Sequence, residues 1–162
     1  MKATGERNSM EGRKEFKISA ICARITSEGT PKSTIAEYYG GNIPWLNTKD
    51  INLNRIYKTD KIISDLGLKS SSAKLIAINS VIAAMYVATA SKTAIIKIPL
   101  TTNQACCNLT IDPTTADYRF VYYALCNDYD RLNFLANNRT QQNLNAQQIK
   151  LNMQEAQSLS TS

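Results

Sequence analysis

INSVIAAMYVATASKTAIIKIPLTTNQACCNLTID, the stretch from Ile78 to Asp112, decides the fold because it holds most of the continuous apolar sequence of the chain. Three runs within it, Ile78–Met85, Ala94–Ile98 and Ala105–Ile111, are rich in β-branched residues and are bounded by polar turns. Such runs are typical of short strands. The sequence therefore predicts strands that present short polar loops, an arrangement that suits a rigid scaffold with a binding edge.

Helices are expected on both sides of this stretch. The apolar positions of FKISAICARIT, residues 16–26, fit one face of a short helix. After Asp112-Pro113, Thr114 or Thr115 is expected to cap a helix over about residues 116–136, and its apolar stripe would pack on the sheet.

The region between Lys32 and Ser72 predicts shorter elements. Trp45 lies in a short extended segment, residues 42–46, and is expected to be a core anchor. Residues 56–64 alternate in part and predict a strand, whereas Gly67 and the serines after it predict a turn. The combination of strands and helices indicates an α+β domain.

The domain organisation follows from length and local composition. A chain of 162 residues suits one globular domain with its own core. Residues 1–15 are polar, and we expect a disordered or peripheral tail there. From residue 140 the composition changes sharply to Gln and Asn, which predicts a weak helix or a segment that needs a partner. The folded domain is therefore expected over residues 16–139.

The charge is concentrated in the middle of the chain. The formal net charge is +6, and the segment from Lys49 to Lys97 holds eight lysines and arginines against three acidic residues. Such an excess favours polyanionic partners. A solvated lysine-rich face explains the same charge equally well.

Several kinds of chemistry are missing from the sequence. The chain has no histidine, which excludes Cys-His zinc sites and His-based triads. Of the four cysteines, Cys106 and Cys107 are adjacent in a predicted strand and should point to opposite faces, which argues against a four-cysteine zinc site. No phosphate-binding glycine loop or activated nucleophile is present. We therefore expect a non-enzymatic protein without catalytic residues, metal or cofactor.

The location of the protein is expected to be cytoplasmic. Residues 1–17 are charged and lack the apolar core of a secretory signal, and the longest apolar runs are too short to cross a bilayer. No membrane partner is expected, and the cysteines should be buried, reduced thiols.

An ordered set of motifs resembles the target-recognition domain of type I restriction–modification specificity subunits. The resemblance covers roughly four-fifths of the chain, from Phe16 to about Leu144. Each block is weak alone, whereas the set in this order is specific. The blocks are Gly29-Thr30-Pro31, Tyr38–Trp45, Asp50-Ile51, Gly67–Leu75, Ala88–Lys92 and Thr102–Cys107.

The resemblance implies both a fold and partners. It implies a curved mixed β-sheet recognition domain with flanking helices and a C-terminal helical tail, in which residues 140–162 begin a partly frayed helical spacer. Such a domain reads one half of a split target in double-stranded DNA, and the subunit has no catalytic activity. Its expected partners are the methyltransferase (modification) subunits and, through them, the restriction motor subunit. A second copy or a full-length specificity subunit is a further candidate partner.

The expected DNA-binding residues lie in the polar loops of these blocks. Arg and Lys recognise guanine and Asn recognises adenine in the major groove, so Asn47, Lys49 and Lys92 are the candidate base readers. The full set is Lys32, Ser33, Thr34, Asn47, Lys49, Lys69, Ser70, Ser71, Tyr86, Thr89 and Lys92.

The chain also departs from the family pattern. The family loop reads close to Gly-Ala-Thr-x-Gly-Lys, whereas Val87 and Ser91 stand at its two glycine places. Glycine at such places often holds a positive φ, which would strain Val87 or reshape the loop. One recognition domain is present, so a half-subunit or truncated form is expected. The alternative function is a DNA-incompetent fragment that binds methyltransferase or specificity subunits.

Overall fold

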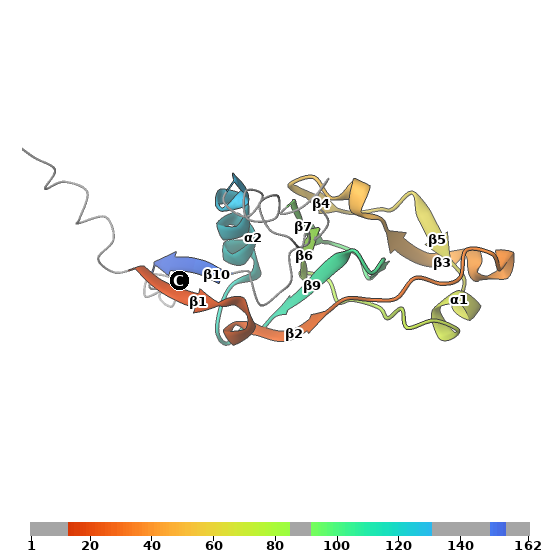
Figure 1. The fold of residues 1–162 in the computed structure, drawn as a ribbon, viewed down its shortest axis with the longest axis horizontal. Coiled ribbons are helices and arrows are strands. Elements are labelled where there is room, and N and C mark those ends of the chain that lie inside the picture. The colour runs from red at the N-terminus through yellow and green to blue at the C-terminus, as the bar shows by residue number, and fades with distance from the viewer. Residues whose placement is uncertain (1–12, 85–91, 131–149, 155–162) are drawn as a thin grey trace, which may run out of the picture.

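The structure, a computed structural model, describes residues 13–84, 92–130 and 150–154 (Figure 1). The described residues form three sheets and few helices, which confirms the predicted α+β fold with mixed sheets. The central sheet has the strand order β2-β9-β6-β7-β4. Its strands are β2 (Cys22–Thr26), β9 (Cys106–Ile111), β6 (Val81–Ala84), β7 (Thr93–Ile96) and β4 (Asn54–Ile56).

The three strands predicted within Ile78–Asp112 are confirmed as β6, β7 and β9 at the centre of this sheet. β6 pairs antiparallel with β7, where Ile82 lies opposite Ala94, and with β9, where Ile82 lies opposite Asn108. Every residue of β6 and β7 is buried. Apart from Thr93, the residues of both strands are apolar, which suits strands that are covered on both faces of the sheet.

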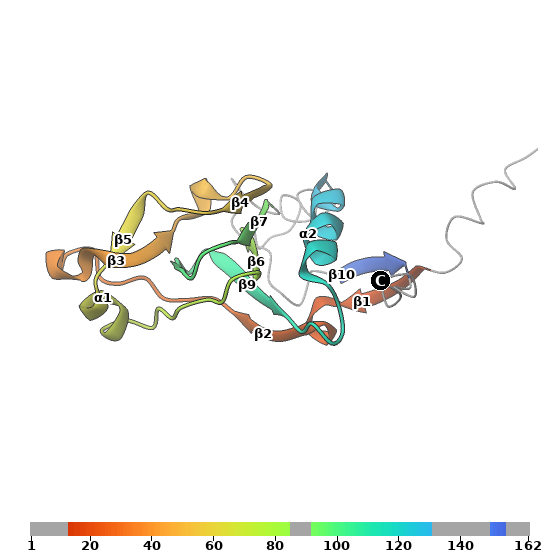
Figure 2. The ribbon, with the colours of Figure 1, turned by 180° about the vertical axis from the view of Figure 1, so that it is seen from behind.

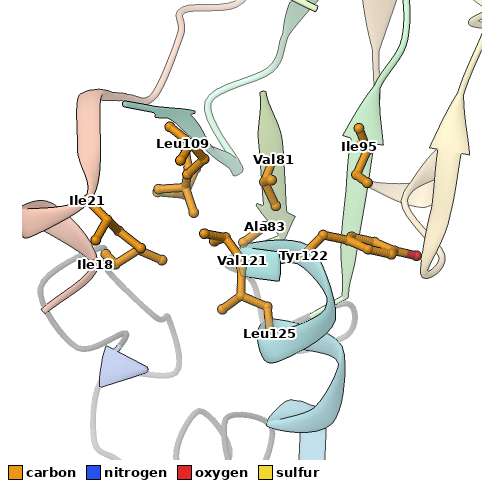
Figure 3. Packing of buried hydrophobic residues seen from close by; sticks show 11 residues of the cluster. Ile18, Ile21, Val81, Ala83, Ile95, Leu109, Val121, Tyr122 and Leu125 are labelled. Carbon is orange, nitrogen blue, oxygen red and sulfur yellow. The ribbon is translucent and has the colours of Figure 1, made fainter. Parts of the chain in front are cut away.

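Two hydrophobic cores lie on the two faces of the central sheet. Helix α2 (Tyr118–Asn127) covers one face, where Val121, Tyr122 and Leu125 pack against the sheet (Figure 3). The other face packs against residues such as Leu46 and Leu100. Cys107 belongs to the first core and Cys106 to the second, which confirms that the adjacent cysteines point to opposite faces.

A smaller lobe lies at the end of the molecule away from α2. We call it the distal lobe; it consists of the sheet β5-β3-β8 with one 3-10 helix and α1 (Figure 1). Its own core contains Ile43, Trp45 and Ile63, so the prediction that Trp45 is a core anchor is confirmed. The elements are the 3-10 helix Ala36–Tyr38, β3 (Tyr39–Leu46), β5 (Lys61–Ile63), α1 (Asp65–Lys69) and β8 (Thr101–Thr102).

The two ends of the described chain meet at the opposite end of the molecule. β1 (Arg13–Lys17) pairs antiparallel with β10 (Lys150–Gln154), and Figure 2 shows this pair from behind, far from α1. Residues 13–15 therefore form a strand where a disordered or peripheral tail was expected. Residues 150–154 form a strand where a helical spacer was expected. Each strand needs a partner more than 130 residues away, which no local pattern reveals.

The helix expected over residues 16–26 is not observed. The segment contains the end of β1, a 3-10 helix (Ile18–Ala20) and then β2. The pairing of β2 with β9 is irregular between Cys22 and Arg24, which face Ile111 and Thr110. Such a bulge interrupts the alternation of a strand. The apolar spacing consequently resembles a helix.

Two helix boundaries also differ from expectation. The turn expected at Gly67 is helix α1, and the side chain of its N-cap residue, Ser64, accepts a hydrogen bond from the Gly67 amide at 3.0 Å. Helix α2 begins at Tyr118 and is capped by Asp117. The Thr114 hydroxyl instead donates to Asp112 in the preceding turn, at 2.7 Å. Asp117 was missed because three potential caps follow one another closely.

The single strand expected over residues 56–64 is divided. β4 ends at Ile56 and β5 begins at Lys61, and the two strands belong to different sheets. A turn lies between them, in which the Thr59 hydroxyl donates to the Lys61 carbonyl at 2.6 Å. A strand that changes sheets cannot be recognised from alternation alone.

Candidate functional site

The predicted DNA-binding residues in the described chain fall into two groups, and the first lies in the distal lobe. Lys32, Ser33 and Thr34 precede the 3-10 helix Ala36–Tyr38. Lys69 is the last residue of α1, and Ser70 and Ser71 follow it. Close backbone packing joins these segments. A Cβ atom on Gly67 would collide with the Tyr38 carbonyl, and one on Gly29 would collide with the Ser72 hydroxyl. The fold therefore brings these six residues to one end of the molecule.

Most of this distal group is available to a ligand. Lys32, Ser33, Thr34, Lys69 and Ser70 are all exposed. Ser71 has a structural role, because its hydroxyl donates to the Gly67 carbonyl at 2.8 Å and accepts from the Ala73 amide at 3.2 Å. The surface is of mixed charge, since Glu37 and Asp65 are also exposed there.

The second group, Asn47, Lys49 and Lys92, lies at one end of the central sheet. The side-chain amide of Asn54 donates to the Asp50 carbonyl at 3.3 Å, which holds the 3-10 helix Thr48–Asp50 beside β4. Asn54 lies opposite Ala94 in β7, and the backbone carbonyl of Lys92 accepts a hydrogen bond from the Ala84 amide at 2.9 Å. Lys49 and Lys92 are consequently placed at the same end of β4 and β7.

The side chains of this second group differ in their freedom. Lys49 is exposed and Lys92 is half-buried. The backbone N–H of Asn47 donates to the Asp50 carboxylate at 3.3 Å. The side-chain oxygen of Asn47 accepts from the Thr48 hydroxyl, also at 3.3 Å. Neither bond uses the side-chain nitrogen of Asn47. That nitrogen is the donor with which an Asn side chain recognises adenine N7.

Two predicted site residues, Tyr86 and Thr89, lie outside the described residues, as do Val87 and Ser91. They belong to the segment that joins β6 to β7, adjacent to Lys92. β3 connects the two described groups, because the first group packs around the segment before β3 and Asn47 directly follows its last residue, Leu46.

Sequence reasoning missed Arg55 and Lys97 as members of a possible site. The Arg55 guanidinium donates to the Tyr123 hydroxyl at 3.3 Å, and the Lys97 ammonium lies 5.5 Å from the centre of the Tyr118 ring. The spacing of Tyr118 and Tyr122 by four residues was the available signal, because it places both rings on one side of α2. Nothing local to β4 or β7 indicated that these cations would face that side.

The described residues show no arrangement for metal or thiol chemistry. No group of three or more Cys, Asp or Glu side chains among them is placed to hold a metal ion. Burial raises the pKa of the Cys106 and Cys107 thiols to about 12 and that of Cys22 to about 11. These thiols are protonated at neutral pH and are therefore poor nucleophiles. No helix in the described part of the chain is long and apolar enough to cross a membrane.

Comparison with protein families gives a match to nearly the whole chain. Residues 10–153 match the model of the type I restriction modification DNA specificity domain. The chain is 31% identical over 98 residues to the EcoR124I/EcoR124II specificity subunit of Escherichia coli, covering 58% of this chain and 24% of that protein. It is 33% identical over 88 residues to the MjaIX specificity subunit of Methanocaldococcus jannaschii, covering 52% of this chain and 20% of that protein.

Solved structures of low sequence identity share the fold. The HsdS subunit from Thermoanaerobacter tengcongensis superposes with a TM-score of 0.58 at 16% identity, covering 87% of this chain and 33% of that chain. The S subunit from M. genitalium gives a TM-score of 0.62 at 16% identity, covering 97% of this chain and 37% of that chain. The chain thus spans about a third of these subunits and a quarter or less of the curated relatives.

Proposed function

Because the chain belongs to the family of type I restriction modification DNA specificity domains, we propose that it binds double-stranded DNA sequence-specifically and directs partner subunits to a target. The observation that carries the proposal is the match to this family over residues 10–153, which includes both groups of predicted site residues. Methylation and cleavage would be performed by the partner subunits, and this chain would supply recognition.

The exposed polar loops support a DNA-binding role. Lysines and hydroxyls on both the distal lobe and the end of the central sheet can contact phosphates, and phosphate contacts fix the register of a protein on a duplex. The two groups lie before and after β3, and one duplex would contact both in this proposal. Residues 16–139 form the recognition unit in this proposal.

Base reading is assigned to the group at the end of the central sheet. Asn47 has a side-chain nitrogen that its two local hydrogen bonds do not use, and Lys49 is exposed beside it. Lys92 lies at the same end of β7 and adjoins the segment of Tyr86 and Thr89. A side chain held by rigid elements presents its donors in a fixed direction, which base recognition requires.

The proposed protein partners are type I methyltransferase subunits and, through them, the restriction motor subunit. The relatives that match over part of their length are specificity subunits. This assignment rests on the family match over residues 10–153.

Selection from a randomised duplex pool tests the proposal. The chain would be used alone and together with its presumed methyltransferase subunit. We expect enrichment of one short motif, and loss of that motif in the Asn47→Ala variant. Asn52→Ala is the matched control, because Asn52 is an exposed asparagine in the next loop and is not assigned to the site.

Two results would contradict the proposal. Recovery of unselected, salt-sensitive DNA alone would mean that the basic surface binds phosphates without reading bases. Co-purification with a methyltransferase subunit without measurable duplex affinity would instead indicate a protein-interaction fragment.

A further inference from the structure

Arg55 lies among three tyrosines at the edge of the central sheet, outside the predicted DNA-binding residues. Its Nη2 atom donates to the Tyr123 hydroxyl at 3.3 Å, and its Cζ atom lies 5.9 Å from the centre of the Tyr122 ring. The bond to Tyr123, together with the nearby phenols of Tyr122 and Tyr57, raises the pKa of Arg55 above its ordinary value. The guanidinium is therefore a fixed positive charge at this position.

The position of Arg55 follows from the pairing of β4. This edge strand runs parallel to β7, and Arg55 lies opposite Ile95. Ile56 packs in the core on the other face, so alternation turns Arg55 toward α2. Tyr122 packs in the same core as Ile95, and Figure 3 shows its ring passing by Ile95 with the hydroxyl at the outer end.

A second cation, Lys97, lies at the boundary between β7 and α2. The Thr93 hydroxyl contacts the Cys126 sulfur at 3.4 Å, whereas Lys97 at the other end of β7 lies over Tyr118. The strand and helix thus run in opposite directions. Arg55, beside Ile95, and Lys97 consequently lie next to each other on the α2 face, about 7 Å apart along the strand direction, whereas Lys92 precedes the first residue of β7.

The side chains of Arg55, Lys97 and the neighbouring tyrosines are hydrogen-bond donors. A guanidinium has five N–H donors, and the bond to Tyr123 uses one of them. The side chains of Tyr57 and Tyr123 are 64% and 53% exposed, so their hydroxyls can reach a ligand. The Lys97 ammonium donates to the Asn79 side-chain oxygen at 2.8 Å and to the Tyr118 hydroxyl at 3.5 Å, which leaves one of its three N–H donors for a ligand. Asp117, a nearby carboxylate at the start of α2, is already paired with Arg119 at 2.7 Å.

We infer that Arg55, Tyr57, Tyr123 and Lys97 form a second binding site, whose ligand is the phosphodiester backbone of duplex DNA. Identification of the polyanion as DNA rests on the proposed function. This position favours a DNA strand over an acidic protein surface because β4 and β7, which carry the site, begin beside Lys49 and Lys92, two of the proposed base readers. The site would hold the backbone beside the half-site without reading sequence.

Two measurements on the full chain test this inference. The first is the affinity for a mixed-sequence duplex as a function of salt. We expect Arg55→Gln to reduce the slope of log K against log salt by about 1 and to weaken all sequences by a similar factor. Tyr123→Phe should weaken binding less and leave the slope unchanged, because it removes a hydroxyl and no charge.

The matched control is Arg119→Gln. Arg119 is an exposed arginine on the same helix, and its charge is already compensated by Asp117. This variant should keep the wild-type slope. Circular dichroism and thermal melting establish whether each variant is folded. If Arg55→Gln is unfolded, the weaker binding expected of Tyr123→Phe tests the inference in its place.

The second measurement uses inorganic phosphate as the probe. The side-chain Nε–H resonances of ¹⁵N-labelled protein are followed during a phosphate titration, and the Arg55 signal is identified by its absence in Arg55→Gln. We expect the Arg55 signal to shift and that of Arg119 to remain in place.

The outcomes separate this inference from the proposed function. An unchanged slope in Arg55→Gln would overturn the inference, while an enriched motif in the duplex selection would still support the proposed function. No duplex binding by the wild type, with a phosphate-dependent shift of Arg55, would overturn the proposed function and remove DNA as the ligand. Loss of a methyltransferase subunit from Arg55→Gln at unchanged DNA affinity would overturn the inference in favour of a protein interface.

Discussion

The carbonyl oxygen of Tyr38 occupies the space where a Cβ atom of Gly67 would lie. This contact joins the 3-10 helix before β3 to helix α1. It is supported by Ser64, whose hydroxyl donates to the Glu37 carbonyl at 2.6 Å and accepts from the Gly67 amide. The contact brings Lys32–Thr34 and Lys69–Ser71 to the same end of the distal lobe.

Gly67→Ala is therefore expected to destabilise the chain by roughly 1–3 kcal/mol. The new methyl group would collide with the Tyr38 carbonyl, which is held in place by a hydrogen bond from the Ser64 amide. Urea denaturation monitored by the fluorescence of Trp45 measures the loss, since Trp45 lies in the core of the distal lobe. Ser70→Ala, at the exposed end of the same helix, is the control. Equal stability of the two variants would contradict the close contact.

Leu125→Ala should cost about 2–5 kcal/mol, because Leu125 is fully buried where α2 packs on the central sheet. Leu66→Ala is the matched control, since the Leu66 side chain on α1 is 47% exposed and its loss should cost far less. Denaturant midpoints compare the two variants. Similar shifts of the two midpoints would mean that Leu125 does not contribute to the packing of α2 on the central sheet.

Lys92→Ala should weaken binding to the selected duplex by roughly 1–3 kcal/mol if Lys92 reads a base, and should relax the preference at one position of the motif. Lys74→Ala removes an exposed lysine outside the proposed base-reading group and should leave the motif intact. Fluorescence anisotropy with the selected duplex and its single-base variants measures both effects. Unchanged affinity and unchanged preference would remove Lys92 from the site.

The stability of the chain should depend on pH through its buried thiols. Burial raises the pKa of Cys106 and Cys107 from 9.0 to about 12, so the folded state disfavours their thiolates. Their contribution to stability is therefore fully present below pH 9 and is lost as the pH rises from 9 toward 12. Tyr122 acts in the same direction, because burial raises the pKa of its phenol from 10.0 to about 12.

Denaturant midpoints at pH 7, 9 and 10.5 measure this dependence. The double variant Cys106→Ala and Cys107→Ala should be less stable at pH 7 and should lose less stability between pH 9 and 10.5. A steeper loss in the double variant would show that other groups cause the alkaline instability.

Part of the group of predicted DNA-binding residues in the distal lobe could be placed from sequence, and part of it could not. Lys32, Ser33 and Thr34 were expected near a turn, and the structure places them beside the end of α1. The α1 helix itself was missed because Gly67 disfavours helices locally. Gly67 is tolerated there because close packing against Tyr38 requires a residue without a side chain.

The sequence by itself determined the central strands, the burial of Trp45 and the opposite orientations of Cys106 and Cys107. These features depend on apolar runs and on the two-residue period of a strand, which are local properties of the chain. Only the tertiary structure decided that β1 pairs with β10 and that Arg55 lies beside Tyr122 and Tyr123. Both contacts depend on which distant segments pair and in which register. A local sequence pattern does not specify the partner of a strand.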